Sequence, residues 1–326
     1  MSEAGPVPEF RTVALFPGQG AYLTETFLHY ADRWPQIADT FQEIDDGTAE
    51  LAIDPISPRL LNGSPPELRE LLAEDPDTLQ LALFGTAVAA HRIVLAQRIR
   101  VQALAGHSFG EIAALVAGGA LTVGRGARIV HLRSRCLESS TESGGMLALR
   151  ARPERARALV AAIDIENLVV AVENGPRQTV LAGPSEALTT AESVAREIGV
   201  TAVRVASPYP FHSPLLVAAA ARFRQRLRPE LTGAVRSPRV PVYSPILRRF
   251  YTGDDDFAEI LADHLVRPVW FTAALRHLES TGARRFIECG ARDALTGIVR
   301  RTLPTASAVP TIVAGTRAVS AAVPAY

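Results

Sequence analysis

The chain of 326 residues contains no lysine, so all 34 of its Lys and Arg positions are arginines. The same number of acidic residues balances them, and the formal net charge is zero. A neutral chain has no general excess of positive charge for nucleic acid or for an anionic membrane, and we expect neither as a partner. The arginine bias itself indicates codon usage in a GC-rich genome rather than a function.

Cysteine is almost as scarce, because Cys136 and Cys289 are the only two. Two isolated cysteines make neither a disulfide framework nor a metal site, so we expect no bound metal. The start of the chain lacks a basic segment followed by an apolar stretch, and we find no apolar run as long as a bilayer span. These absences favour a cytoplasmic protein.

Hydrophobic residues are abundant, at 48% of the chain, which is enough for a substantial core. A buried strand is predicted over residues 12–16, and apolar periodicity predicts a long buried helix over residues 78–99. Another short strand, a glycine-flanked turn and a helix follow over residues 101–121. Helices that alternate with short buried strands predict an α/β fold with a parallel sheet.

The pattern changes near residue 142. From there to residue 207 the order strand, helix, strand, strand, helix, strand is predicted, which is typical of a ferredoxin-like unit. We therefore expect a small inserted ferredoxin-like subdomain over residues 142–207. Residues 1–141 and 208–326 would together form a large, discontinuous catalytic subdomain that is α/β-hydrolase-like, with a short parallel sheet.

The stretch "GHSFG" at residues 106–110 places a serine between two glycines, where the predicted strand ends and a helix begins. Glycines allow a sharp turn there, which would project the Ser108 hydroxyl outward. The backbone N–H of Phe109 would lie at the helix N-terminus, where it suits an oxyanion. A helix-capping serine between packing glycines has the same pattern, so the pentapeptide alone does not decide between the two.

This stretch resembles the nucleophile motif, Gly-His-Ser-x-Gly-Glu, of the family that contains malonyl-CoA:acyl-carrier-protein transacylases and polyketide synthase acyltransferase domains. Further segments resemble motifs of that family and follow in its order, across roughly residues 12–305. They are "FPGQG" at 16–20, "LRSR" at 132–135, "NGPRQTVLAG" at 174–183, "YPFHS" at 209–213, "HLVRPVWF" at 264–271 and "FIECGARDALTGIV" at 286–299.

The resemblance implies that Ser108 is a nucleophile and that His212 is its general base. An imidazole can take the serine proton and later return a proton to the leaving thiol. The family needs no triad aspartate, because a backbone carbonyl near the "HLVRPV" motif orients the histidine. We assign that role to His264, where the family usually has Asn or Gln. The backbone N–H groups of Gln19 and Phe109 would form the oxyanion hole.

The resemblance also assigns Arg133 to the substrate. The family arginine at this place forms a two-pronged ion pair with the free carboxylate of malonyl-type substrates, for which the planar guanidinium is suited. The alternative is a solvated arginine on a helix surface, common in a chain so rich in arginine. Arg135 lies two residues further, on another face of the helix, and we interpret it as structural.

Three more residues are expected at the substrate. His107 is assigned a supporting role, because its neighbour Ser108 occupies the tight turn. Tyr209 follows the family's methylmalonyl pattern, whereas Phe211 follows its malonyl pattern. A bulky ring directly before His212 leaves less room for a branched acyl group, so we favour malonyl.

These observations predict an acyltransferase that moves malonyl from CoA, through an acyl-Ser108 intermediate, to the phosphopantetheine thiol of an acyl carrier protein. The pathway would be polyketide or fatty acid biosynthesis. We expect a monomer with no bound cofactor, and a carrier protein supplied in trans because the chain starts at its own methionine.

Three alternatives stay open at this point. One is transfer of a larger acyl or aminoacyl group between two carrier proteins. Another is a serine hydrolase, including a proofreading acyl-carrier thioesterase. The third is a degenerate, non-enzymatic docking module, which the presence of both Ser108 and His212 disfavours.

Overall fold

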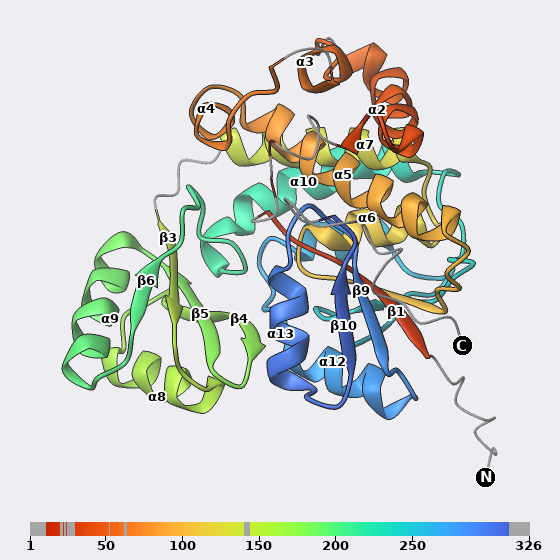
Figure 1. Ribbon diagram of the computed structural model, residues 1–326. Coiled ribbons are helices and arrows are strands. Elements are labelled where there is room, and N and C mark those ends of the chain that lie inside the picture. Colours follow the sequence, from red (N-terminus) through yellow and green to blue (C-terminus); the bar gives the residue numbers. More distant parts are fainter. Residues whose placement is uncertain are drawn as a thin grey trace.

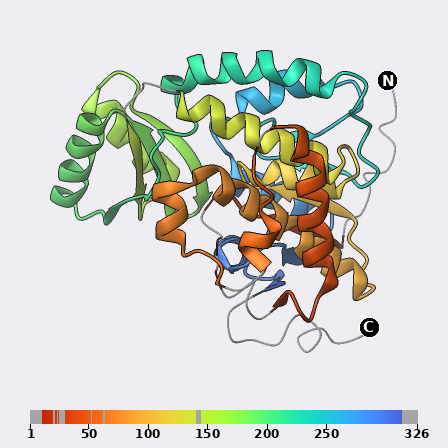
Figure 2. The ribbon, with the colours of Figure 1, turned by 90° about the horizontal axis from the view of Figure 1, so that it is seen from above.

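The structure is a computed structural model that describes residues 11–19, 22, 24, 30–51, 53–61, 64–139 and 144–312. It contains a six-stranded sheet and a four-stranded sheet, each with its own hydrophobic core. Figures 1 and 2 show the four-stranded sheet and its two helices projecting from one side of the larger part.

The six-stranded sheet has the order β10-β9-β1-β2-β7-β8. Every neighbouring pair is parallel except β7 and β8, which are antiparallel. The sheet therefore confirms the predicted α/β fold with a short parallel sheet. Its strands are β1 (Thr12–Phe16), β2 (Ala103–Gly106), β7 (Val242–Ser244), β8 (Arg249–Phe250), β9 (Arg285–Glu288) and β10 (Ser307–Pro310).

Helices pack around this sheet and supply most of the larger core. Helices that are far apart in the sequence contact one another, and α7, for example, packs against both α2 and α10. The helices are α2 (Pro35–Thr48), η1 (Ala49–Leu51), α3 (Ser57–Leu61), α4 (Leu68–Glu74), α5 (Pro76–Ala96), α6 (Gly110–Ala117), α7 (Val123–Glu138), η2 (Pro214–Leu216), α10 (Val217–Leu231), α11 (Phe257–Asp263), α12 (Phe271–Ser280) and α13 (Ala294–Thr302).

The helix α5 corrects one expectation from the sequence. Its 21 residues are long and apolar enough to cross a bilayer by length and composition, whereas no such run was predicted. Within the structure, 78% of its most apolar stretch is buried, and it contacts α2, α6 and α7. A mostly apolar helix that is buried on several sides is typical of a protein core.

The four-stranded sheet has the order β4-β5-β3-β6, and all its pairs are antiparallel. Along the chain the elements run strand, helix, strand, strand, helix, strand, as the sequence indicated. They are β3 (Gly145–Leu149), α8 (Pro153–Ile163), β4 (Val169–Gly175), β5 (Gln178–Gly183), α9 (Ser185–Glu197) and β6 (Ala202–Arg204). The subdomain boundaries at residues 142 and 207 stay predictions, and residues 140–143 lie outside the described residues.

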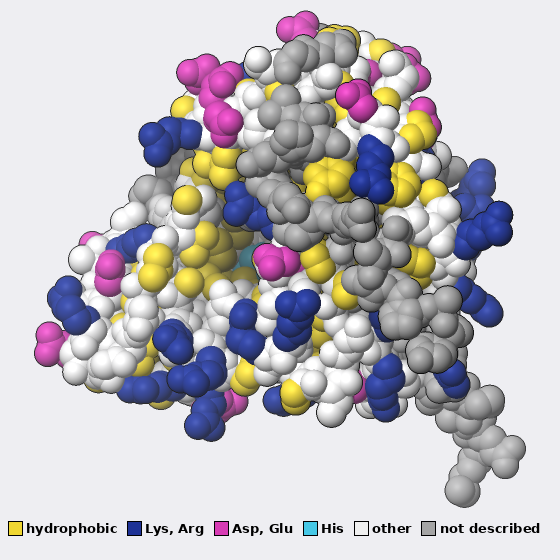
Figure 3. Space-filling view, in the orientation of Figure 1, with side chains coloured by type: hydrophobic (Ala, Val, Ile, Leu, Met, Phe, Trp, Pro, Cys, Tyr) yellow, Lys and Arg dark blue, Asp and Glu magenta, His cyan; other side chains and the backbone are white. Residues whose placement is uncertain are grey.

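The four-stranded sheet is joined through β4 to the segment between α11 and α12 of the larger part. Val172 forms a parallel bridge with Val269, a residue that directly follows the segment Arg267-Pro268. The Glu173 N–H donates to the Val269 carbonyl at 2.9 Å, and the Val269 N–H donates to the Ala171 carbonyl at 2.9 Å. In Figure 3 a hollow with hydrophobic side chains on its wall lies between the two parts, with a histidine visible inside it.

Candidate active site

Ser108 lies in a tight turn between β2 and α6. Its φ of +55° is in the left-handed region, which a residue with a side chain enters only where its surroundings hold it there. Glycine is required on both sides. A Cβ on Gly106 would lie 2.2 Å from the Glu111 nitrogen, and one on Gly110 would lie 2.1 Å from the Phe16 carbonyl oxygen. The chain therefore packs tightly enough here to hold the serine hydroxyl outward.

The Ser108 hydroxyl meets His212, which is 104 residues further along the chain. The Ser108 Oγ lies 2.6 Å from the His212 Nε2, and the His212 Nδ1 lies 2.8 Å from the Arg267 carbonyl oxygen. A carbonyl only accepts, so Nδ1 carries the ring proton and donates it. Nε2 is then free to accept from the serine hydroxyl. The backbone N–H of His212 donates to the Leu265 carbonyl at 2.7 Å, which fixes the residue itself.

The ring of His212 is neutral at physiological pH. Burial lowers its pKa from the usual 6.5 to about 3, and the Arg267 carbonyl offsets this only in part. A neutral imidazole that faces a serine hydroxyl has the protonation state that a general base requires.

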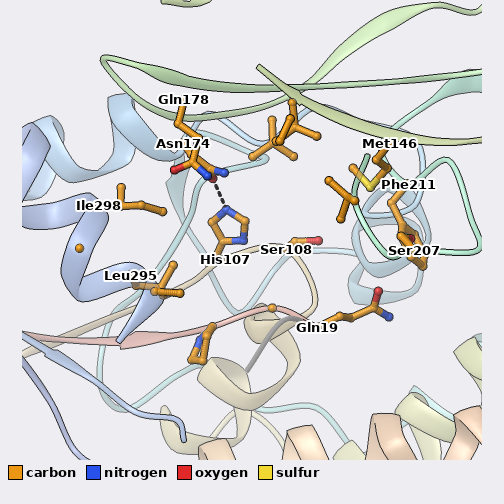
Figure 4. Close-up of a pocket in the computed structure, with 18 of the residues that line it drawn as sticks. Gln19, His107, Ser108, Met146, Asn174, Gln178, Ser207, Phe211, Leu295 and Ile298 are labelled. Carbon is orange, nitrogen blue, oxygen red and sulfur yellow. Dashed lines mark hydrogen bonds between the residues drawn. The ribbon is translucent and has the colours of Figure 1, made fainter. Parts of the chain in front are cut away.

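Ser108 and His212 border a cavity of about 620 Å³, which lies between the two sheets. Figure 4 shows the Ser108 hydroxyl between Leu295 and Ile298 on one side and Phe211 and Met146 on the other. Most of the wall is apolar. The lining residues are Pro17, Gly18, Gln19, His107, Ser108, Met146, Ala148, Val172, Asn174, Gln178, Val180, Val205, Ala206, Ser207, Phe211, His212, Asp293, Ala294, Leu295, Gly297, Ile298 and Arg301.

Two backbone N–H groups near Ser108 have no hydrogen-bond acceptor among the described residues. Neither Gln19 nor Phe109 donates its N–H to another residue in the part of the chain that the structure describes. The loop that carries Gln19 lies against the nucleophile turn, because a Cβ on Gly18 would be 3.2 Å from the His107 carbonyl oxygen. Free N–H groups at a helix N-terminus are the usual partners of a developing oxyanion.

His107 supports the neighbouring wall of the cavity. Its Nε2 donates to the Asn174 Oδ1 at 2.7 Å, and its ring meets the Phe271 ring edge-on at 4.9 Å between centroids. Burial lowers its pKa, so this ring is neutral as well. Asn174 and Gln178, at the β4–β5 turn, also border the cavity and were not predicted as site residues. Both lie within the "NGPRQ" motif, which was the available signal.

Arg133 is buried, with 3% of its surface exposed, and lies behind Phe211 rather than among the lining residues. Its guanidinium carbon lies 5.3 Å from the centre of the Phe109 ring and 4.9 Å from that of Phe211. Its one hydrogen bond among the described residues runs from Nη1 to the Gln80 Oε1 at 3.3 Å. Burial lowers its pKa to about 10, which leaves the group charged at neutral pH.

Of the other residues considered in the sequence, Phe211, Tyr209 and Arg135 lie at different distances from the cavity. Phe211 borders the cavity, and Tyr209 contacts it edge-on at 5.7 Å between ring centroids but does not border the cavity itself. Arg135 is exposed and pairs with Glu138, in keeping with the structural interpretation.

Two sequence-based assignments need correction. The carbonyl that orients His212 belongs to Arg267, not to His264, because the α11 C-terminus places residue 267 opposite the ring. The Phe109 ring was assigned no role, yet it packs against the Arg133 guanidinium. Arg267 lies within the "HLVRPV" motif for which such a carbonyl was expected, but a motif does not show which of its carbonyls faces the ring, nor which side chains its rings contact.

No group of three or more His, Cys, Asp or Glu side chains in the described residues is arranged to hold a metal ion. Cys136 and Cys289 are both buried and free.

The comparisons with known proteins agree with this geometry. A family model described as an acyl transferase domain matches residues 64–320. Malonyl-CoA:acyl carrier protein transacylase (FabD) from Xanthomonas oryzae has a similar structure, with a TM-score of 0.82 and 30% identity over 94% of this chain and 96% of that one. The acyltransferase domain from the second module of the salinomycin polyketide synthase gives a TM-score of 0.81 at 30% identity, covering 94% of this chain and 70% of that one.

A sequence relative is the spectinabilin polyketide synthase system protein NorA' of Streptomyces orinoci, 31% identical over 94% of this chain. This chain spans only 8% of that synthase. Because the family model matches most of its length, the chain belongs to the acyl transferase domain family.

Proposed function

We propose that this acyltransferase moves a malonyl group from CoA to the phosphopantetheine thiol of an acyl carrier protein by way of an ester on Ser108. The observation that carries the proposal is the 2.6 Å contact between the Ser108 hydroxyl and a neutral His212 at a substrate-sized cavity. The similarity to FabD enzymes and synthase acyltransferase domains supports malonyl-CoA and the carrier protein as substrates.

In the first half-reaction the Ser108 oxygen attacks the thioester carbonyl carbon while the His212 Nε2 takes the serine proton. The carbonyl oxygen becomes an oxyanion, which the N–H groups of Gln19 and Phe109 stabilise. The carbon–sulfur bond then breaks, and the imidazolium returns the proton to the CoA sulfur. The products are free CoA thiol and an acyl ester on Ser108.

The second half-reaction reverses these steps with a different thiol. His212 takes the proton of the phosphopantetheine thiol, whose sulfur attacks the ester carbonyl. The bond between the carbonyl carbon and the Ser108 oxygen breaks, and the serine oxygen recovers its proton from His212. One thioester is thus exchanged for another, with no net consumption of water.

Arg133 supports a carboxylated acyl group. It is a buried cation, and no carboxylate in the described part of the chain pairs with it. An unpaired buried charge is costly, and a substrate carboxylate would compensate it through two parallel hydrogen bonds. Because Phe211 stands between Arg133 and the cavity, this pairing requires the Phe211 ring to turn aside.

Mass spectrometry of the intact protein after incubation with malonyl-CoA tests the proposal. We expect a malonyl adduct on Ser108 that disappears when a carrier protein with a free phosphopantetheine thiol is added. The adduct should be absent from Ser108→Ala and strongly slowed in His212→Asn. Release of malonate to water at the same rate, with no malonyl carrier protein formed, would instead indicate a hydrolase.

A second candidate function is favoured by the cavity wall. Met146, Val172, Val180 and Ile298 make it largely apolar, and Arg133 is shielded from it by Phe211. Such a wall also suits a larger, neutral acyl or aminoacyl group moved between two carrier proteins. A Ser108 adduct formed from such a carrier thioester, but not from malonyl-CoA, would favour this candidate over the first.

We further infer that the enzyme is a cytoplasmic monomer and that the carrier protein binds in trans. The buried free thiols of Cys136 and Cys289 support a reducing compartment. Gel filtration tests whether the enzyme is a monomer. Transfer of the acyl group to a separately purified carrier protein tests whether the carrier binds in trans.

A further inference from the structure

Three buried polar side chains meet beneath the nucleophile turn and have no part in the chemistry above. The Tyr251 hydroxyl lies 2.7 Å from the Glu111 Oε2 and 3.1 Å from the His264 Nε2. The His264 Nε2 also lies 3.3 Å from the same Glu111 oxygen. Glu111 is completely buried, and Tyr251 and His264 are about 5% exposed or less.

The directions of these hydrogen bonds follow from the groups involved. The tyrosine has one O–H, and the short contact shows that it donates to the carboxylate. The His264 Nε2 must then carry a proton and donate toward Tyr251 and Glu111. The carboxylate lies in the first turn of α6, where the helix dipole also favours negative charge. The three groups therefore form one hydrogen-bonded unit through the Glu111 Oε2, while the Glu111 Oε1 has no hydrogen-bond partner among the described residues.

Each end of this unit is close in sequence to one half of the catalytic pair. Glu111 lies three residues after Ser108, and its N–H donates to the Ser108 carbonyl at 2.9 Å. His264 caps the C-terminus of α11, and the next three residues include Leu265 and Arg267. Those two carbonyls are the ones that accept the backbone N–H and the Nδ1–H of His212.

We propose that Glu111, Tyr251 and His264 are positioning residues that set the distance between the nucleophile turn and the loop that orients the base. The unit ties the start of α6 to the end of α11, and so holds the Ser108 oxygen opposite His212. The inference rests on the proposed function, because it assigns the unit to the Ser108–His212 pair.

The strongest variant is Tyr251→Phe, since it removes the central hydroxyl but keeps the ring that stacks on Phe257 at 5.5 Å. A displacement of the base by a fraction of an ångström lowers the rate of chemistry without removing a substrate contact. We expect kcat to fall about tenfold, with KM within about twofold of the wild type. His264→Leu should behave alike, whereas His264→Gln, which keeps an N–H donor, should recover to within about threefold.

The measurement is the single-turnover rate of Ser108 acylation by malonyl-CoA, per mole of folded enzyme, beside the melting temperature of each variant. Thr281→Val is the matched control. It removes a buried hydroxyl bonded to the Leu278 carbonyl at 2.8 Å, at the end of α12. We expect it to lower the melting temperature while leaving the acylation rate unchanged.

The inference is overturned if Tyr251→Phe and His264→Leu lose melting temperature but acylate at the wild-type rate, or if His264→Gln is no faster than His264→Leu. Failure of the proposed function looks different, because the wild type itself would then carry no malonyl group on Ser108.

Discussion

At the scale of single residues, Arg133 has the most unusual environment. It is a charged group enclosed by two phenyl rings, with one neutral amide as its hydrogen-bond partner among the described residues. Contact with ring faces offsets only part of the cost of burying a cation. Such a group stabilises the folded chain poorly, and its presence is explained better by a ligand than by the fold.

Replacing Arg133 by leucine should therefore separate function from stability. We expect kcat/KM for malonyl transfer to fall about 100-fold, since hydrogen bonds to a charged group contribute about 1.5–3 kcal/mol each. The melting temperature should hold or rise, because a buried charge is removed. Transfer of a neutral acyl group, such as acetyl, should hold or improve.

The control for this change is Arg135→Leu, which removes an exposed arginine two residues away that pairs with Glu138. Exposed pairs of this kind contribute little, so activity and stability should stay near wild type. If Arg133→Leu transferred malonyl within threefold of the wild-type rate, roughly the effect of losing one weak contact, the carboxylate role would be wrong.

At this scale the sequence predicted side chains better than their surroundings. Ser108 and His212 stand in recognisable motifs, and the structure brings them together. Their partner Arg267 lies in the "HLVRPV" motif where an orienting carbonyl was expected, but every residue type has a carbonyl, so the sequence could not show which one faces His212. The role of Phe211 as a screen in front of Arg133 depends on a fold that joins residues 78 positions apart.

At the scale of elements, the turn from β2 into α6 carries the tightest backbone contact of the site. The Gly110 position faces the carbonyl oxygens of Phe16 and Pro17, which belong to the end of β1 and the loop that carries Gln19. The turn that carries Ser108 and the loop that carries Gln19, the residues proposed as nucleophile and oxyanion donor, are thus held together by close backbone packing.

Gly110→Ala should break this contact. The added methyl group would lie 2.1 Å from the Phe16 carbonyl oxygen, which is backbone and cannot rotate away. We expect a loss of about 3 kcal/mol in the free energy of unfolding, measured by urea titration, and a severe loss of Ser108 acylation.

Gly145→Ala in β3 provides the comparison, because its added methyl group would meet only the Leu188 side chain, at 3.6 Å. That is an ordinary contact, and this variant should be as stable as the wild type. Equal stability of Gly110→Ala and Gly145→Ala would show that the turn relaxes and that its tight packing is dispensable.

Elements with strong periodicity were predicted well. The strand predicted over residues 12–16 is β1, and the helix predicted over residues 78–99 is α5, shifted by two or three residues at each end. Helix α2, which was not among these predictions, begins at Pro35, and proline fits the first turn of a helix. Several of the residues before it lie outside the described chain.

At the scale of the whole molecule, buried histidines make stability depend on pH. Burial lowers the pKa of His91 to about 4 and that of His212 to about 3, and it also lowers the pKa of His107. In the unfolded chain each ring binds a proton below about pH 6.5. Acid therefore favours the unfolded state, and the stability present above pH 6.5 is lost as the pH falls.

The contribution of Glu288 to stability has the opposite pH dependence. Burial raises its pKa from 4.5 to about 6, although it accepts N–H bonds from Leu295 and Thr296 at the start of α13. Its contribution is present below pH 4.5 and is lost as the pH rises through about 6. The stability gained from this one carboxyl group as the pH falls only partly offsets the stability lost through the three histidines.

We therefore expect the free energy of unfolding to fall by on the order of 3 kcal/mol between pH 6.5 and pH 5. Urea titrations across this range measure it directly. His91→Leu, which changes a buried ring outside the catalytic cavity, should reduce the pH dependence by about a third. A free energy of unfolding that stays flat over this range would show that the histidines are hydrated in the folded protein.

The backbone bridge between Val172 and Val269 has a mechanical consequence. It joins the four-stranded unit to the segment beside Arg267, whose carbonyl orients the catalytic imidazole. The hydrogen bonds of this bridge lie next to the residue whose carbonyl faces the His212 ring. The four-stranded unit is thus tied to the chain two residues from the carbonyl that accepts the His212 Nδ1–H, so a change that loosens this bridge is expected to disturb the base as well.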